Sequence, residues 1–363
     1  MNKKGVEFYE GCLLGGAIGD AIGAPIEFVQ SVASIKSRCG ANGVSGYTEY
    51  EDGTGGFTDD TQMTLFTAEG ILRARHRALI KGITGAERQI VYHSYLRWLY
   101  TQGVEIDPSK ITEGVYNIDS GWLVKEKFLF QRRAPGNTCI DSLKSGVAGD
   151  IGIKINESKG CGGVMRVAPA GLAYFDDREK AFETGARFAA ITHSHPSGYL
   201  SAGTFSAIIS GLARGEALAD AVERSLNILK KWDGHAETLW AAERAVNWSM
   251  SEPAEPETLE KLGGGWVGEE ALAISIFCAL KFPDDFKRGV LLSVCHGGDS
   301  DSTGSIAGNM LGLINGRGAI PSEWVEKLRG REIVERMARD LHILYKGDSY
   351  DQDEEWLERY PPF

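Results

Sequence analysis

Apolar side chains recur every three or four positions along most of this 363-residue chain, which is the spacing of one face of an α-helix. Turns rich in Gly, Pro, Asp and Asn separate these patterns, and no alternating pattern of convincing strand length lies between them. The sequence therefore predicts an all-α fold. Helices are expected at residues 7–23, 60–80, 85–101, 178–192, 197–214, 217–232, 237–249, 268–281, 284–295, 303–315, 322–329 and 331–346.

Many glycines fall inside these helical patterns, although each costs about 1 kcal/mol relative to alanine. The chain contains 46 glycines, which is a high number for a helical protein. Gly15, Gly16 and Gly19 interrupt the first pattern, and Gly308 and Gly312 interrupt a late one. Close packing of helices, or close approach of the backbone to a ligand, would offset that cost.

We predict one compact domain over residues 1–363, because no internal repeat and no convincing linker divides the chain. Residues 101–160 are polar, weakly periodic and rich in turn signals, which indicates an insertion that runs over the surface. A second polar stretch, SEPAEPET at 251–258, is expected to be an exposed loop. The acidic tail DQDEEWLERYPPF also holds aromatic residues, so it either docks on the domain or extends from it.

Composition narrows the functional classes. A net charge of −11 argues against nucleic acid or an anionic membrane as the main partner. No stretch approaches eighteen apolar residues in a row, and the N-terminus has no signal-peptide core, so we expect a cytoplasmic protein. The six cysteines form no CxxC pair, which indicates neither a zinc knuckle nor a disulfide scaffold. Cys12, Cys278 and Cys295 are expected to be buried free thiols.

The motif HGGDSDSTG, at residues 296–304, directly precedes a helical pattern that is rich in small residues. Asp, Ser and Thr are common there because they cap free backbone N–H groups and suit the positive end of the helix dipole. A helix needs only one such cap, however, and Asp299 and Asp301 beside Ser302 and Thr303 exceed that need. Clustered oxygen ligands are what hard divalent cations require.

A second acidic helix start lies far upstream in GGFTDDTQMTLF, where Thr58 can cap a helix whose first turn holds Asp59 and Asp60. Capping alone would explain this motif if it stood by itself. Two helix N-termini that face each other, each with two Asp and a hydroxyl, would instead supply the carboxylates of a two-metal site. Such sites position a water nucleophile and polarise the bond that it attacks.

Three further motifs allow either a structural or a functional interpretation. GCLLGGAIGDAIGAPIEF holds Asp20, which could satisfy a neighbouring backbone end, and Glu27, which could simply be solvated. The glycines of KGCGGVMRVAP, at 159–169, could cradle a diphosphate or only form a tight turn. His193 and His195 stand where one helix ends and another begins, and Trp266 is either a stacking platform or a core aromatic.

Taken together and in this order, the motifs resemble the ADP-ribosylglycohydrolase family. The matching stretches, between about residues 8 and 320, are GCLLGGAIGDAIGAPIEF, FTDDTQMTLF, GCGGVMRVAP, THSHP, GGGWVGEEAL and GGDSDSTGSIAGNMLG. The resemblance implies a compact all-α fold. It implies an enzyme that hydrolyses the N-glycosidic bond between ADP-ribose and an acceptor. It also implies a site with two Mg²⁺ or Mn²⁺ ions.

The resemblance assigns a role to each matched residue. Glu27, Asp60 and Asp301 are the expected catalytic acids, and the expected metal ligands are Thr58, Asp59, Asp60, Asp299, Asp301 and Ser302. The expected substrate-binding residues are Gly160, Cys161, Gly162, Gly163, Val164, Met165, His193 and Trp266. Ser302 stands where members often have Thr, and its hydroxyl is an equivalent ligand. Cys161 stands where members commonly have Asn or a small polar residue, which changes the contact expected with a phosphate.

The leading hypothesis is an ADP-ribosylarginine hydrolase that acts on an ADP-ribosylated protein. Related enzymes with a serine, ester or free-metabolite acceptor remain alternatives. So does an immunity protein that binds and blocks an ADP-ribosyltransferase toxin, with residues 101–160 as the expected contact. The complete ligand sets at 58–60 and 299–302 argue against a purely structural protein.

Overall fold

The computed structural model describes residues 4–114, 117–344 and 354–362. Within these ranges the chain forms seventeen α-helices, six short 3₁₀ helices and two strands of two residues each. The prediction of an all-α fold is confirmed, and each helix range predicted from the sequence contains a helix. The fold is one compact domain.

The elements have the following bounds. The longer helices are α1 (Val6–Gly23), α3 (Asp59–Lys81), α4 (Glu87–Thr101), α7 (Arg178–Ala190), α8 (Pro196–Ala213), α9 (Leu218–Leu229), α10 (Ala236–Ser251), α12 (Gly268–Lys281), α14 (Ser300–Asn315) and α16 (Arg331–Ile343). The shorter helices are α2 (Val32–Cys39), α5 (Asn137–Lys144), α6 (Ala168–Ala173), α11 (Pro256–Leu262), α13 (Phe286–Val294), α15 (Ser322–Lys327) and α17 (Glu354–Arg359). The 3₁₀ helices are η1 (Ala24–Ile26), η2 (Pro108–Lys110), η3 (Leu123–Lys125), η4 (Lys127–Phe130), η5 (Cys161–Gly163) and η6 (Arg317–Ala319), and the strands are β1 (Gly55–Gly56) and β2 (Leu328–Arg329).

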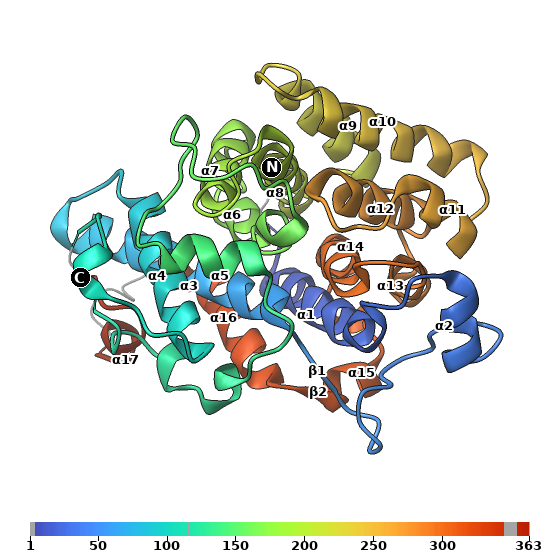
Figure 1. Ribbon diagram of the computed structural model, residues 1–363, viewed down its shortest axis with the longest axis horizontal. Helices are drawn as coiled ribbons and strands as arrows, with labels where there is room; N and C mark the ends of the chain where they lie inside the picture. Colours follow the sequence, from blue (N-terminus) through green and yellow to red (C-terminus); the bar gives the residue numbers. More distant parts are fainter. Residues whose placement is uncertain (1–3, 115–116, 345–353, 363) are drawn as a thin grey trace.

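Helices α1 and α14 lie antiparallel at the centre of the fold and pack backbone against backbone (Figure 1). A Cβ atom added to Gly19 would lie 2.0 Å from the carbonyl oxygen of Gly304, and one added to Gly308 would lie 2.1 Å from that of Gly15. Only glycine permits so close an approach. The same spacing of four residues runs along both helices, through Gly11, Gly15, Gly19 and Gly23 on α1 and Gly304, Gly308 and Gly312 on α14. Helix packing therefore explains these glycines.

The other helices flank this central pair. Helix α3 packs on α4 and α16 on one side, and α12 lies between α14 and α10 on the other (Figure 1). Helices α7 and α8 form a further pair that packs on α6. One continuous hydrophobic core runs through these elements. The N-termini of α3 and α14 are thus held by elements that are themselves well buried.

Several helix boundaries differ from those predicted. Helix α14 begins at Ser300 rather than 303 and α3 at Asp59 rather than 60, so Asp59, Asp60 and Asp301 fall inside the first turns and Asp299 is the N-cap of α14. Helix α15 ends at Lys327 rather than 329 because Leu328 and Arg329 pair in parallel with β1. The range predicted as 331–346 ends at Ile343, and residues 345 and 346 lie outside the described part of the chain.

Residues 101–160, which we expected to be a surface insertion, also contribute to the core. Helix α5 and three 3₁₀ helices form within it, and Leu123, Leu129, Cys139 and Leu143 are buried. Residues 115 and 116 of this segment lie outside the described part. In the loop expected at 251–258, α11 already begins at Pro256 and buries Thr258.

The described part of the acidic tail docks on the domain. Trp356 and Tyr360 are buried, and the Tyr360 hydroxyl donates a hydrogen bond to Asp340 Oδ2 at 2.7 Å. The ring nitrogen Nδ1 of His76 lies 2.6 Å from the carbonyl oxygen of Tyr360. Residues 345–353 and 363 lie outside the described ranges.

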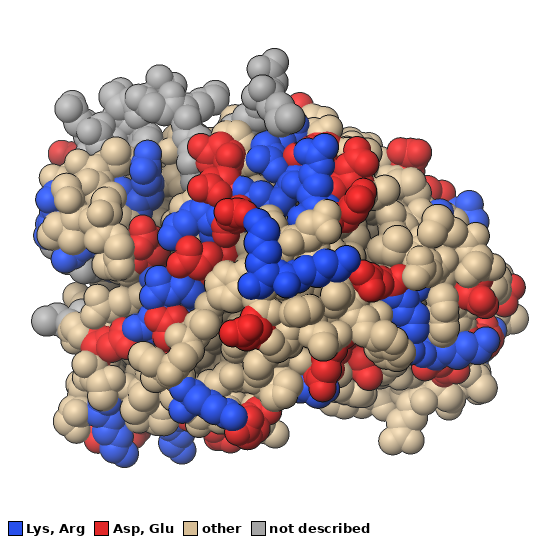
Figure 2. All heavy atoms as spheres, turned by 90° about the horizontal axis from the view of Figure 1, so that it is seen from above, with Lys and Arg blue, Asp and Glu red and all other residues tan. Residues whose placement is uncertain are grey.

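On the face of the molecule shown in Figure 2, charges of one sign form no extended patch. On that face Lys and Arg are interspersed with Asp and Glu (Figure 2). No helix in the described ranges is both long and apolar enough to cross a membrane. All six cysteines are free, and Cys12, Cys278 and Cys295 are buried as predicted.

Candidate active site at two helix N-termini

The first half of the site is the N-terminus of α3. Thr58 is the N-cap, and its hydroxyl oxygen accepts a hydrogen bond from the backbone N–H of Asp60. The fully buried Asp20 of α1 accepts hydrogen bonds from the backbone N–H groups of Thr58 and Thr61, at 2.9 and 3.1 Å. Asp20 therefore satisfies a neighbouring helix end, as one of our two interpretations predicted, and fixes the start of α3.

The second half is the N-terminus of α14. Asp299 is its N-cap, with Oδ1 accepting a hydrogen bond from the N–H of Ser302 at 3.3 Å, and Asp301 Oδ1 accepts from the same N–H at 3.0 Å. The backbone N–H of Asp299 donates to the carbonyl oxygen of Gly264 at 2.8 Å. The Thr58 hydroxyl donates to Asp301 Oδ2 at 3.2 Å, so a hydrogen bond joins the two helix starts directly.

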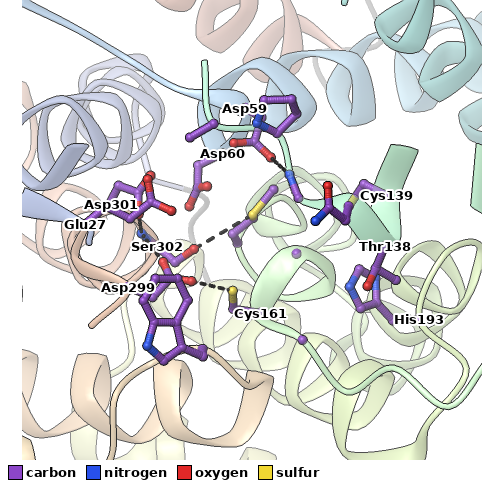
Figure 3. Close-up of a pocket in the computed structure, with 18 of the residues that line it drawn as sticks. Glu27, Asp59, Asp60, Thr138, Cys139, Cys161, His193, Asp299, Asp301 and Ser302 are labelled. Atoms are coloured by element: carbon purple, nitrogen blue, oxygen red, sulfur yellow. Dashed lines mark hydrogen bonds between the residues drawn. The ribbon is translucent and has the colours of Figure 1, made fainter. Parts of the chain in front are cut away.

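Both helix starts form one wall of a cavity of about 350 Å³ (Figure 3). Figure 3 shows the labelled acidic residues gathered on one side, with Thr138, Cys139 and His193 at the other. The predicted residues that line the cavity are Glu27, Asp59, Asp60, Gly160, Cys161, Gly162, Met165, His193, Trp266, Asp299, Asp301 and Ser302. Thr58, Gly163 and Val164 do not line it, and Val164 is fully buried in the core.

Burial dominates the electrostatics of the acidic wall. It raises the pKa values of Asp59, Asp60 and Asp301 well above the usual range, and neighbouring carboxylates raise them further. Burial, followed by the charges of Asp299, Asp59 and Asp20, raises the pKa of Glu27 to about 9. Without a compensating cation, Glu27 is therefore mostly protonated at neutral pH.

The chemistry of the donor set fits hard divalent cations. The side chains are carboxylates and hydroxyls, which are the oxygen ligands that Mg²⁺ and similar ions prefer. Asp60 Oδ1 is buried and has no hydrogen-bond partner. Among the described residues, however, no three Asp, Glu, His or Cys side chains are already grouped so as to hold an ion.

The glycine loop forms the adjoining part of the cavity around η5. The backbone N–H of Cys161 donates to the carbonyl oxygen of Trp266 at 3.1 Å. A Cβ atom added to Gly162 would lie 3.0 Å from Cε1 of His193, so glycine lets the imidazole approach the loop. The Cys161 thiol donates to Asp299 Oδ2 at 2.8 Å and thus faces the acidic wall.

The two histidines occupy different environments. His195 is the N-cap of α8, where its Nδ1 accepts a hydrogen bond from the N–H of Ser197, and it does not line the cavity. His193 does line it, and burial together with the charge of Arg166 lowers its pKa to about 3. The Arg166 guanidinium donates to Thr192 Oγ1 at 2.7 Å, and that oxygen lies 2.8 Å from His193 Nδ1. This chain of hydrogen bonds suits a neutral imidazole with its proton on Nε2.

Sequence reasoning missed two parts of the cavity. Residues 134–139 line it, and the backbone N–H of Gly136 donates to Asp59 Oδ2 at 3.2 Å. Ala134 in this segment has a positive φ of 47°. The motif APGN marked a turn there, but no spacing tied that turn to α3. Phe28 also lines the cavity, directly after Glu27.

Known proteins resemble this chain over nearly its whole length. The sequence model of the ADP-ribosylglycohydrolase family matches residues 3–351. ADP-ribosylhydrolase ARH3 of Mus musculus is 25% identical over 387 residues, which cover 95% of this chain and 94% of the mouse protein. ADP-ribosylarginine hydrolase Tri1 of Serratia proteamaculans (strain 568) is 25% identical over 94% of this chain and 80% of its own length. A solved structure named ADP-ribosylglycohydrolase-related protein complex superposes with a TM-score of 0.61 at 23% identity, covering 93% of this chain and 98% of that one.

Proposed function

Because the chain belongs to the ADP-ribosylglycohydrolase family, we propose that it hydrolyses the N-glycosidic bond between ADP-ribose and an arginine of a modified protein, using two divalent cations. The observation that carries the proposal is the shared cavity wall built from the N-termini of α3 and α14. That wall joins two acidic motifs that lie more than two hundred residues apart in the sequence.

The charge of the cavity supports a cationic acceptor. Glu27, Asp59, Asp60, Asp299 and Asp301 all line it, and their five carboxylates exceed the charge of two divalent cations by one. An arginine guanidinium stays positively charged at neutral pH, whereas serine is neutral. The name of the Serratia relative, an ADP-ribosylarginine hydrolase, points to the same acceptor.

The six oxygen-bearing side chains would hold the ions, Mg²⁺ or Mn²⁺, and these are Thr58, Asp59, Asp60, Asp299, Asp301 and Ser302. When bound, such ions supply Lewis-acid polarisation and a water of lowered pKa. Asp20 and the backbone of Gly264 hold the two helix starts in place and so orient this set.

The remaining side chains account for substrate binding and proton transfer. In the glycine loop, Gly162 offers its backbone N–H to the diphosphate, since the N–H groups of Gly160 and Cys161 already donate to Ser158 Oγ and to the carbonyl oxygen of Trp266. His193 offers an Nε2 proton from the far side of the cavity. A water oxygen forms the new bond to the anomeric carbon of the ribose as the bond from that carbon to the arginine nitrogen breaks. Glu27 accepts one proton of the water and passes it to the leaving guanidine nitrogen, which restores the carboxylate. The products are ADP-ribose and unmodified arginine.

The direct test is release of ADP-ribose from an arginine-ADP-ribosylated protein, with Mg²⁺, with Mn²⁺ and with EDTA. A serine-ADP-ribosylated protein serves as the matched substrate control. Metal-dependent release from the arginine linkage supports the proposal. Release from the serine linkage alone would move the proposal to a neutral acceptor. No release from either would favour the alternative of a protein that binds and blocks an ADP-ribosyltransferase.

A further inference from the structure

Two large aromatic side chains remain exposed at the mouth of the cavity. Phe28 is 69% exposed and Trp266 is 44% exposed, and both line the cavity. Their rings stack with an interplanar angle of 24° and a centroid separation of 5.8 Å. Because Phe28 stays mostly in water and Trp266 keeps almost half of its surface there, the contact leaves much apolar area exposed and contributes little to folding. Core packing therefore does not account for the pair.

The backbone beneath Trp266 is rigidly placed. Its carbonyl oxygen accepts the hydrogen bond from Cys161 in the glycine loop, and Gly264 accepts the one from Asp299. A Cβ atom added to Gly298 would lie only 1.9 Å from the carbonyl oxygen of Gly264, so the two loops touch through their main chains. The indole thus stands on a platform that is fixed to both halves of the site.

The position of Phe28 places the pair at the acidic end of the cavity. Phe28 directly follows Glu27, and Figure 3 shows Glu27 beside Asp301 and away from His193. His193 lies at the other end, which we assign to the diphosphate, with Gly162 of the glycine loop against its ring, whereas the Cys161 thiol of the same loop reaches Asp299. If the glycosidic bond lies at the acidic wall, the group beyond it is the acceptor.

We propose that Phe28 and Trp266 form the subsite for the acceptor arginine, an inference that rests on the proposed function. A planar guanidinium stacks on aromatic faces and is attracted by their negative charge distribution. The one carboxylate charge that the cavity holds in excess of two divalent cations balances its positive charge. A serine acceptor has no planar cation and would gain nothing from this surface.

The test combines kinetics with product binding, using Phe28→Leu, Trp266→Leu and the double variant. Because the side chains are exposed, the variants should fold, and thermal melting checks this. We expect the KM for an arginine-ADP-ribosylated peptide to rise about tenfold in each variant, the size of one cation–π contact. The Kd for ADP-ribose, measured by calorimetry, should change less than twofold. Phe28→Tyr and Trp266→Tyr keep an aromatic ring at each position, so their KM for the same peptide should stay much closer to the wild-type value.

Trp240→Leu is the matched control, because Trp240 is 63% exposed on α10 and does not line the cavity. A parallel loss of ADP-ribose affinity in Phe28→Leu or Trp266→Leu would overturn the inference and assign the pair to the adenine base. An unchanged KM for the arginine substrate in the double variant would also overturn it. In both of these outcomes the wild-type protein still cleaves the arginine linkage, so only the assignment of the aromatic pair fails. A wild type that fails to cleave that linkage instead refutes the proposed function, and the subsite with it.

Discussion

Replacing Gly308 with alanine should push the two central helices apart. The added methyl group would lie 2.1 Å from the carbonyl oxygen of Gly15 and 2.6 Å from its carbonyl carbon, whereas ordinary contact begins at 3.4 Å. Both neighbouring atoms belong to the backbone of α1, so no side-chain rotation can relieve the clash. Helices α1 and α14 must therefore separate by about 1 Å, since a close-packed interior has no spare volume.

The expected loss of stability follows from two opposing terms. Overpacking of a filled interior costs about 1–3 kcal/mol, and the better helix propensity of alanine returns up to about 1 kcal/mol. Unfolding entropies of about 2.1 cal/mol/K per residue imply that each kcal/mol lowers Tm by about 1.3 °C in a chain of 363 residues. We expect Gly308→Ala to lower Tm by about 1–3 °C. The effect on turnover should be larger, because Glu27 follows the end of α1 and Asp301 lies in the first turn of α14. A displacement of about 1 Å at a reacting centre costs about a hundredfold in rate.

Calorimetric melting and turnover of the ADP-ribosylated substrate, measured on the same preparation, test both expectations. Gly318→Ala is the matched control, because no atom lies within 4 Å of its added Cβ. A Gly308→Ala protein that melts at or above the wild-type temperature with unchanged kcat would refute the close contact of the two helices. A loss of Tm in the control of the same size would show that any glycine replacement has this effect.

Three further predictions concern the site and the tail. Asp59→Ala and Asp301→Ala should each abolish turnover and leave the far-UV circular dichroism spectrum unchanged. An undiminished rate in either variant would refute the proposed metal site. The pKa of Glu27 lies near 9 in the folded cation-free protein, above its ordinary value of 4.5, so its stabilising contribution is complete below about pH 4.5 and is lost as the pH rises towards 9. Mg²⁺ or Mn²⁺ at one fixed concentration, about a hundred times its Kd at pH 6, should therefore raise Tm by about 3 °C or more at pH 6 and by more at pH 8.5. A rise in Tm that does not depend on pH would contradict this reasoning. Trp356→Ala should cost about 3–5 kcal/mol in denaturant unfolding because its side chain is buried, and a cost below about 1 kcal/mol would mean that the tail does not dock.

The sequence predicted all the longer helices, but of the shorter ones it predicted α13 and α15 and missed others such as α6 and α11. A helix of thirteen residues or more repeats its apolar stripe several times, as α3 and α8 do over 23 and 18 residues. Helices α6 and α11 have only six and seven residues, so they lack the repeats that distinguish a helix from a turn. In α11 the surrounding prolines and acids also resemble a loop. The last two residues of the range predicted for α15 form strand β2 instead. A strand of two residues is too short to leave an alternating pattern in the sequence.

The site shows a different limit, because its motifs are local but its geometry is not. The acidic pairs at 59–60 and 299–301 were visible as separate helix starts, and their pairing in one site was a hypothesis that the family resemblance then strengthened. A physical signal for their pairing was nevertheless present in the four-residue spacing of glycines on both α1 and α14. That spacing predicts a helix face that another backbone can approach, yet it does not identify the partner. In the structure the two glycine faces meet, Gly23 touches the start of α14 at Ser300, and Glu27 is thereby carried to Asp301. The close backbone contact is thus what assembles the site, which is why a methyl group on Gly308, remote from the cavity, is expected to reduce turnover.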